Sequence, residues 1–335
     1  MPVLRAVINI ADIRLPTGSD QEMAFRTFSN YVGAFRNWAE YLYPHGHGLL
    51  AGLSEAVKGQ PWRLRRRARS SELGAKAAQA LRIAWGTELC LNVPPVVGGD
   101  VVAVGNLWAP AQAYYAAYHA IRAIEMVTSQ SDGPTTHAGV LRVASQQLSK
   151  PTSPFVVPWT VRALGSEDGF RFEGFGSVVP DPTISNLTAP TVSNAPHLVA
   201  KALKTTRKGQ IEEHRERWCS ALKTKAGQKR KTLPRALRIS NSEKMPPTTL
   251  FDLLWRLRTR TNYEEGDLFL SGSLSPADAA DFQAALSDLV AATLLTAEIY
   301  LSHLVGDVAL RRCAAELTVP PELVSTSVRA RFPLW

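Results

Sequence analysis

The sequence predicts a mainly α-helical fold, a helical bundle interrupted by a long insertion that contains a small β-hairpin. Three observations support this prediction. Residues 20–43 and 110–127 carry apolar side chains at the spacing of amphipathic helices. The helical pattern returns from 247 to 317, whereas residues 151–195 are rich in Pro and Thr. With 335 residues, 45% of them hydrophobic, the chain is long enough to bury a large core.

The first 99 residues are expected to add helices before the bundle. In residues 20–43, Phe25, Phe28, Val32 and Phe35 recur at helical intervals, and Ser19 or Asp20 could cap the segment. Residues 73–91 give a second, weaker helical pattern. Pro94-Pro95 and Gly98-Gly99 are expected to end this N-terminal helical region.

The bundle itself is expected to form from two halves, 100–149 and 247–317, separated by an insertion at 150–246. Within the insertion, residues 169–176 alternate aromatic and polar side chains as a hairpin does. A basic helix from about 197 to 225 and a Lys/Arg-rich loop to about 242 follow, and 318–335 form a C-terminal tail.

Composition argues against several classes of protein. Cys90, Cys219 and Cys313 are too far apart for a disulfide framework or a zinc site, and no phosphate-binding loop, nucleophile elbow or zinc-protease motif occurs. We therefore expect no metal and no cofactor. The longest apolar stretch, 286–305, contains Asp288 and Glu298, which favours a buried helix over a membrane span. A cytoplasmic protein without membrane contact is expected.

The positive charge of the chain is concentrated in one segment. Residues 201–244 hold 14 Lys and Arg against 4 Glu, while the rest of the chain is nearly neutral. Such a segment is typical of polyanion binding, with Trp218 and Trp62 as candidate stacking faces for bases. The alternative is a solvated basic loop. The candidate nucleic-acid-binding residues of this segment and of a second cluster are Arg63, Arg65, Arg66, Arg67, Arg207, Arg215, Lys223, Lys225, Lys229, Arg230 and Lys231.

Two short motifs carry more aromatic and polar side chains than helix packing alone needs. The first is Tyr114-Tyr115-x-x-Tyr118-His119-Ala120, and the second is Arg258-x-x-Thr261-Asn262-Tyr263. Between them lies His137-Ala-Gly-Val. In order and spacing the three segments resemble those of the HEPN domain family. The resemblance covers about a third of the chain and implies a HEPN-like helical bundle.

The resemblance also implies a function. Many HEPN proteins are metal-independent endoribonucleases of stress response, toxin–antitoxin systems or phage defence, and they act as homodimers or in larger assemblies. It points to His119, Arg258, Asn262 and Tyr263 as catalytic residues and to RNA, rather than DNA, as the partner. His137 is a second candidate base and Arg122 a second candidate cation.

The family's usual catalytic pair is an arginine followed closely by a histidine. The one pair at this spacing is Arg207 and His214, which lie in the insertion and not in the closing helices where the family places its pair. This departure favours the alternative of a catalytically inactive, nucleic-acid-binding or protein-interaction subunit. Packing roles for the tyrosines and a structural role for Arg258 also remain open.

Overall fold

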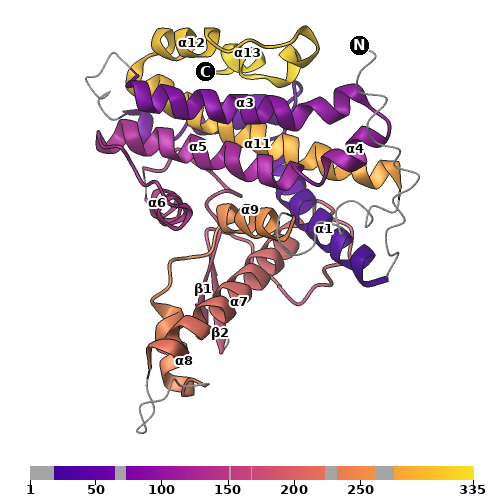
Figure 1. Ribbon diagram of the computed structural model, residues 1–335, viewed down its shortest axis with the longest axis vertical. Coiled ribbons are helices and arrows are strands. Elements are labelled where there is room, and N and C mark those ends of the chain that lie inside the picture. The colour runs from indigo at the N-terminus through magenta and orange to yellow at the C-terminus, as the bar shows by residue number, and fades with distance from the viewer. Residues whose placement is uncertain (1–18, 65–72, 151, 167, 223–231, 262–274) are drawn as a thin grey trace.

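The computed structural model describes residues 19–64, 73–150, 152–166, 168–222, 232–261 and 275–335 (Figure 1). In these ranges the protein is mainly helical, with one small antiparallel sheet, as predicted. The longer elements are, in chain order, α1 (Ser19–Leu42), α2 (Leu49–Lys58), α3 (Ala75–Val97), α4 (Asp100–Gly105), α5 (Ala109–Ser129), α6 (His137–Ser149), β1 (Arg162–Ser166), β2 (Gly169–Glu173), α7 (Ala195–Ala221), α8 (Arg235–Glu243), α9 (Leu250–Thr259), α11 (Pro276–Val305) and α12 (Asp307–Ala315).

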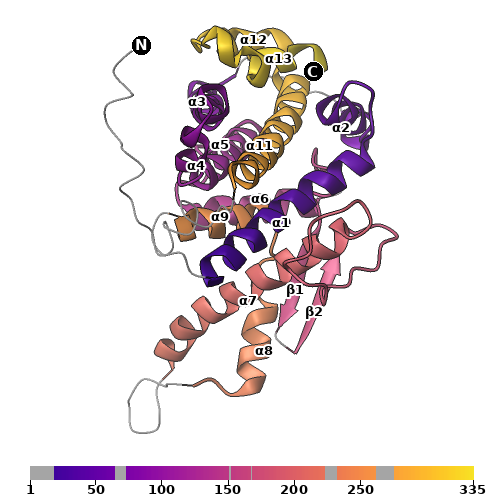
Figure 2. The same cartoon turned by 90° about the vertical axis from the view of Figure 1, so that its right-hand side faces the viewer.

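The bundle is built around α11, which packs against α1, α2, α3 and α5. Figure 2 shows α3, α4 and α5 on one side of α11, with α1 and α2 on the other. By length and composition α11 could cross a membrane, yet most of its apolar stretch is buried inside the protein. A helix that is apolar all round is explained by burial in a core. The N-terminal helices therefore share one core with the rest of the bundle.

Among the described helices, α3 and α5 make the most extensive contact, where small side chains let the backbones approach. Ala80 and Ala84 of α3 are buried, as are Ala113, Ala116 and Ala120 of α5. The alanines of the first motif therefore act in packing, which leaves the tyrosines of α5 to contact α6 and α9.

Helix α3 continues through Pro94 and Pro95, which lie in its last turn, and ends before Gly98, the second part of the expected stop. Pro95 has no N–H to donate to the carbonyl of Leu91 four residues earlier. The buried side-chain amide of Gln283, from α11, donates to that carbonyl instead at 2.5 Å. This replacement donor is a tertiary contact, so the sequence of α3 alone does not reveal it.

The insertion differs from its predicted organisation in two respects. Residues 169–173 form only the second strand of the hairpin, and the first is β1, with Ala163 opposite Phe172. The expected basic loop before 242 contains the helix α8. Helix α7 packs its first half on α1 and β1, and its second half extends with α8 away from the bundle (Figure 1). We call α7 from Lys201 onward, together with α8, the arm.

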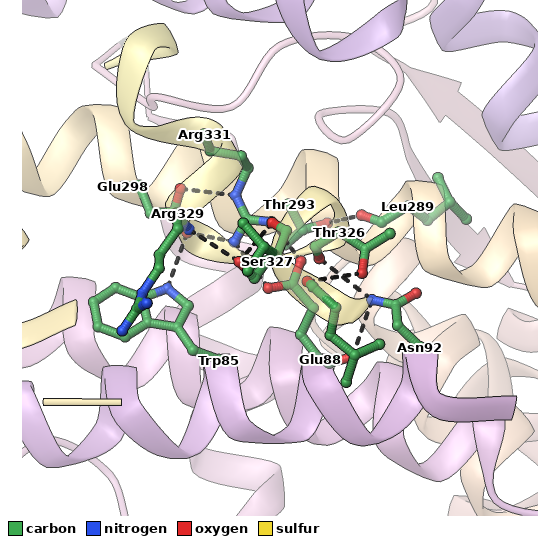
Figure 3. Close-up of polar contacts among 12 residues, drawn as sticks. Trp85, Glu88, Asn92, Leu289, Thr293, Glu298, Thr326, Ser327, Arg329 and Arg331 are labelled. Carbon is green, nitrogen blue, oxygen red and sulfur yellow. Dashed lines mark hydrogen bonds and ion pairs between the residues drawn. The ribbon is translucent and has the colours of Figure 1, made fainter. Parts of the chain in front are cut away.

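The C-terminal residues, expected to be a tail, fold back onto the bundle as η5 (Pro321–Thr326), α13 (Val328–Arg331) and η6 (Phe332–Leu334). Arg331 is 2% exposed and lies between two fully buried carboxylates, Glu88 of α3 and Glu298 of α11 (Figure 3). Its guanidinium donates two hydrogen bonds to each, at 2.5 and 2.9 Å to Glu88 and at 2.9 and 2.7 Å to Glu298. Trp85 and Trp335 also donate to Glu298, each at 2.9 Å.

This buried network holds two carboxylates and one guanidinium, so one negative charge is uncompensated within it when both acids are ionised. Burial raises the pKa of Glu88 to about 7, and Arg331 only partly opposes this. Buried charges require partners, and here the partners come from three elements far apart in the sequence. The network therefore fastens the C-terminus to α3 and α11.

Candidate functional site

The two motif helices, α5 and α9, lie side by side, as the motif comparison predicts. The guanidinium of Arg258 donates a hydrogen bond to the hydroxyl of Tyr115 at 3.0 Å. Helix α9 begins with a capping box, in which the carboxylate of Asp252 accepts hydrogen bonds from the backbone N–H and the hydroxyl of Thr249. Side chains 143 residues apart are thereby brought into contact.

Arg258 is 8% exposed and packs against aromatic faces. Its guanidinium carbon lies 4.7 Å from the ring centre of Trp255 and 5.5 Å from that of Tyr115. A desolvated guanidinium gains roughly 2 kcal/mol or more from such contacts. This arrangement joins α9 to α5, so Arg258 has a structural role whatever else it does.

His137 sits at the start of α6, whose first turn is capped by the side chain of Thr136. Its Nδ1 lies 3.0 Å from the hydroxyl of Tyr114, and its ring centre is 4.7 Å from that of Trp255. Burial and then the charge of Arg258 lower the pKa of His137 below its usual 6.5. The imidazole is therefore mainly neutral at pH 7, which is the form that can accept a proton.

His119 lies on α5 beside this group, with its ring edge-on to Tyr118 at 5.0 Å. Burial, Arg122 and His137 lower the pKa of His119 to about 4. Its Nδ1 is buried and has no hydrogen-bond partner among the residues that the structure describes. Arg122 packs over the Tyr118 ring at 5.8 Å.

These side chains form what we call the aromatic–histidine cluster: Tyr114, Tyr115, Tyr118, His119, His137, Trp255 and Arg258. Of the four predicted catalytic residues, His119 and Arg258 belong to it and are linked through Tyr115 and Tyr118. Asn262 and Tyr263 lie outside the described residues. Trp255, which the motifs did not single out, contacts both His137 and Arg258.

The arm carries the described part of the basic segment. Lys204, Lys208, Arg215 and Trp218 are four, seven and three residues apart along α7, so they fall within about 80° of one another around the helix. We call these four residues the arm stripe. Lys208 and Arg215 are exposed, and Trp218 is half-buried. The Trp218 ring stacks on His214 with ring centres 5.8 Å apart and planes 25° apart.

Two of the predicted contacts with nucleic acid, Arg207 and Trp62, require correction, whereas Arg215 does not. Arg207 is fully buried, and its guanidinium donates to the carbonyls of Gly165, Ser242 and Pro246, so it is not free to contact a nucleic acid. Trp62 is 3% exposed and packs edge-on against Tyr300 and His303, which removes it as a stacking face for bases. Arg215 is exposed, as a surface contact requires.

The other predicted contacts fall where the structure gives no account of the side chain: Arg63, Arg65, Arg66, Arg67, Lys223, Lys225, Lys229, Arg230 and Lys231. The last five belong to the sequence that joins α7 to α8.

Comparison with known proteins gives no relative. No protein-family model matches the chain, and neither a curated protein nor a solved structure matches it.

Proposed function

We propose that the chain is a HEPN-like RNA-binding protein whose arm binds the phosphate backbone and stacks unpaired bases. The observation that carries this proposal is the arm stripe, in which three cations and an aromatic ring share one face of a helix that extends from the bundle (Figure 1). Positive side chains interleaved with an aromatic ring are the usual elements of single-strand recognition. The stripe is about 21 Å long at 1.5 Å per residue, long enough to follow several nucleotides.

The distribution of acidic residues on α7 supports the same face. Glu213 pairs with Arg217 at 2.8 Å, which neutralises both on a different side of the helix. Lys208 and Arg215 have no ion pair within the described part of the chain. Their charges are therefore available to an external anion. The five Lys and Arg at 223–231 extend the same basic segment in sequence.

The test is the affinity of the full chain for a fluorescent single-stranded RNA. Trp218→Ala should weaken binding by about tenfold, because stacking of one base contributes about 1–3 kcal/mol. Lys208→Gln with Arg215→Gln should weaken binding and reduce its dependence on salt. Arg312→Gln, an exposed arginine on α12, is the matched control. Equal affinity in all four proteins would refute the proposal.

A second candidate function, metal-independent RNA cleavage, is favoured by one observation in the aromatic–histidine cluster. A mainly neutral imidazole, His137, lies near a permanent cation, Arg258, and both contact tyrosines of α5. Transfer of the 2′-hydroxyl proton to a base, with a cation stabilising the phosphate charge, needs such a pair.

Cleavage in EDTA with 2′,3′-cyclic phosphate ends, lost in His137→Asn, would support this second function. If RNA stays intact while salt-sensitive binding persists, the protein is the inactive binding subunit. His137→Asn should retain its far-UV circular dichroism, since the side chain is partly exposed at the helix start. This control separates loss of chemistry from loss of fold.

A further inference from the structure

A pocket of about 650 Å³ lies between the second half of α6 and the segment that connects α8 to α9. Arg142, Ser145, Ser149 and Lys150 line it from the side of α6, and Lys244 and Pro246 line it from the connecting segment. It is separate from the aromatic–histidine cluster, which meets α6 at its first residue, His137. Neither Arg142 nor Lys150 belongs to the basic segment recognised in the sequence.

The charge of this pocket is wholly positive. Arg142, Lys150 and Lys244 line it and are exposed, no carboxylate lines it, and none of the three has an ion pair among the described residues. The groove of about 500 Å³ between α7 and α9 provides a contrast, because Glu212, Glu213 and Asp252 line it together with Arg256 and Arg260. An anion is attracted by the cations of the first pocket, whereas the carboxylates of the second repel it.

Hydrogen bonds from Arg207 fix the pocket wall that carries Lys244. The buried guanidinium of Arg207 donates to the carbonyls of Ser242 and Pro246, which flank Lys244 in the sequence. The hydroxyl of Ser145 donates to the carbonyl of Pro247 at 3.3 Å, which ties α6 to the same segment. The two walls that carry the cations are thus joined before any ligand arrives, and this lowers the entropic cost of binding.

The remaining polar groups define what the pocket can recognise. The hydroxyl of Ser149 already donates to the carbonyl of Ser145 and accepts from Arg162. Donors available to a ligand are therefore the three cationic groups and the side-chain amide of Gln146. Three cationic donors with no carboxylate among the lining residues suit a phosphate group rather than a cation.

We propose that this pocket is a phosphate-binding site, with Arg142 and Lys244 as its principal contacts from opposite walls. The phosphate could belong to an RNA backbone or to a free phosphorylated ligand, since both present the same oxygens. Arg207, predicted from the sequence to contact nucleic acid directly, is here the positioning residue that fixes the wall bearing Lys244. The assignment stands on the pocket itself and does not depend on RNA binding by the arm.

The experiment is isothermal titration calorimetry of the full chain with sodium pyrophosphate at low ionic strength. Arg142→Gln with Lys244→Gln should weaken pyrophosphate binding by at least about tenfold, because two charge-assisted hydrogen bonds are lost. Arg171→Gln with Arg312→Gln removes the same charge at two exposed arginines elsewhere and should leave binding unchanged. Absence of binding to the wild type, or equal loss in both double variants, would overturn the proposal.

A parallel titration with single-stranded RNA distinguishes the two sources of phosphate. If the pocket holds the RNA backbone, the Arg142/Lys244 variant loses affinity for RNA as well as for pyrophosphate. If pyrophosphate binds at the pocket and RNA does not bind the protein at all, the pocket takes a free phosphate and only the proposed RNA-binding function fails. Both results support the pocket.

Discussion

Replacing Arg331 by methionine should destabilise the protein more than any surface substitution. The change removes the four hydrogen bonds that the guanidinium donates to Glu88 and Glu298 and leaves two carboxylates in a site from which water is excluded. Removing one partner of a buried ion pair costs about 3–5 kcal/mol. We expect a loss in that range at pH 8, which lies above the pKa of about 7 that Glu88 has beside Arg331.

The pH dependence provides an internal check on this reasoning. Glu88 has a pKa of about 7 even beside Arg331, so in the variant it should become protonated below neutral pH and part of the penalty should disappear. Urea unfolding followed by tryptophan fluorescence at pH 8 and pH 5.5 measures both values.

Arg329→Met is the control, since that side chain is exposed and, within the described part of the chain, donates only to the carbonyl of Leu317. It should cost less than about 1 kcal/mol. A variant at Arg331 within about 1 kcal/mol of wild type at pH 8 would show that the network does not fasten the C-terminus.

Three further predictions concern Glu88 of this network and two parts of the aromatic–histidine cluster. The pKa of Glu88 is raised from 4.5 to about 7, so the folded state holds this proton more tightly than the unfolded state does. The stability that this group contributes therefore falls as pH rises from 4.5 to 7. Glu88→Gln should flatten that part of a stability profile measured by urea unfolding. The pKa of His119 is lowered to about 4, so its contribution to stability is lost as pH falls from 6.5 toward 4. Its C2 proton should titrate near pH 4 by NMR, and a midpoint near 6.5 would contradict its burial. A double-mutant cycle of Arg258→Met and Tyr115→Phe should give a coupling of about 1 kcal/mol in urea unfolding, and no coupling would mean that their hydrogen bond does not join α9 to α5.

Three helices of the bundle, α1, α5 and α6, follow from apolar periodicity, and so do their positions in sequence. The prediction for 20–43 corresponds to α1, that for 110–127 to α5, and the helix expected at 137–148 to α6. The meeting of the two motifs was also predicted, because Tyr115 and Arg258 each lie on a helix face with too many polar and aromatic side chains for simple packing. Periodicity is a local property, so these elements are recovered from the sequence alone.

Other features depend on long-range contacts and could not be predicted. Glu88 and Arg331 look like ordinary surface charges in the sequence, and Glu298 is an acid within an apolar stretch. Only the folded backbone shows that the three share one buried site. Arg207 belongs to a basic run, yet its neighbours along α7 place it inward toward β1 and the segment before α9. The continuation of α3 through Pro95 requires a donor from α11.

The cations that line the positive pocket come from separate parts of the sequence. Arg142 and Lys150 are isolated cations in a nearly neutral region, and Lys244 is the last residue of the basic segment. A charge count by segment therefore assigns them to different parts of the protein, although they line one pocket.

The most direct test of RNA binding by the arm is the salt dependence of affinity for a single-stranded RNA, measured by fluorescence anisotropy. Each phosphate contact contributes about 0.7 to the slope of log K against log salt, so replacing Lys204, Lys208 and Arg215 by glutamine should reduce the slope by about 2. Arg171→Gln with Arg312→Gln should leave it unchanged. An unaltered slope in the arm variant, or no RNA binding by the wild type, would contradict the proposed function.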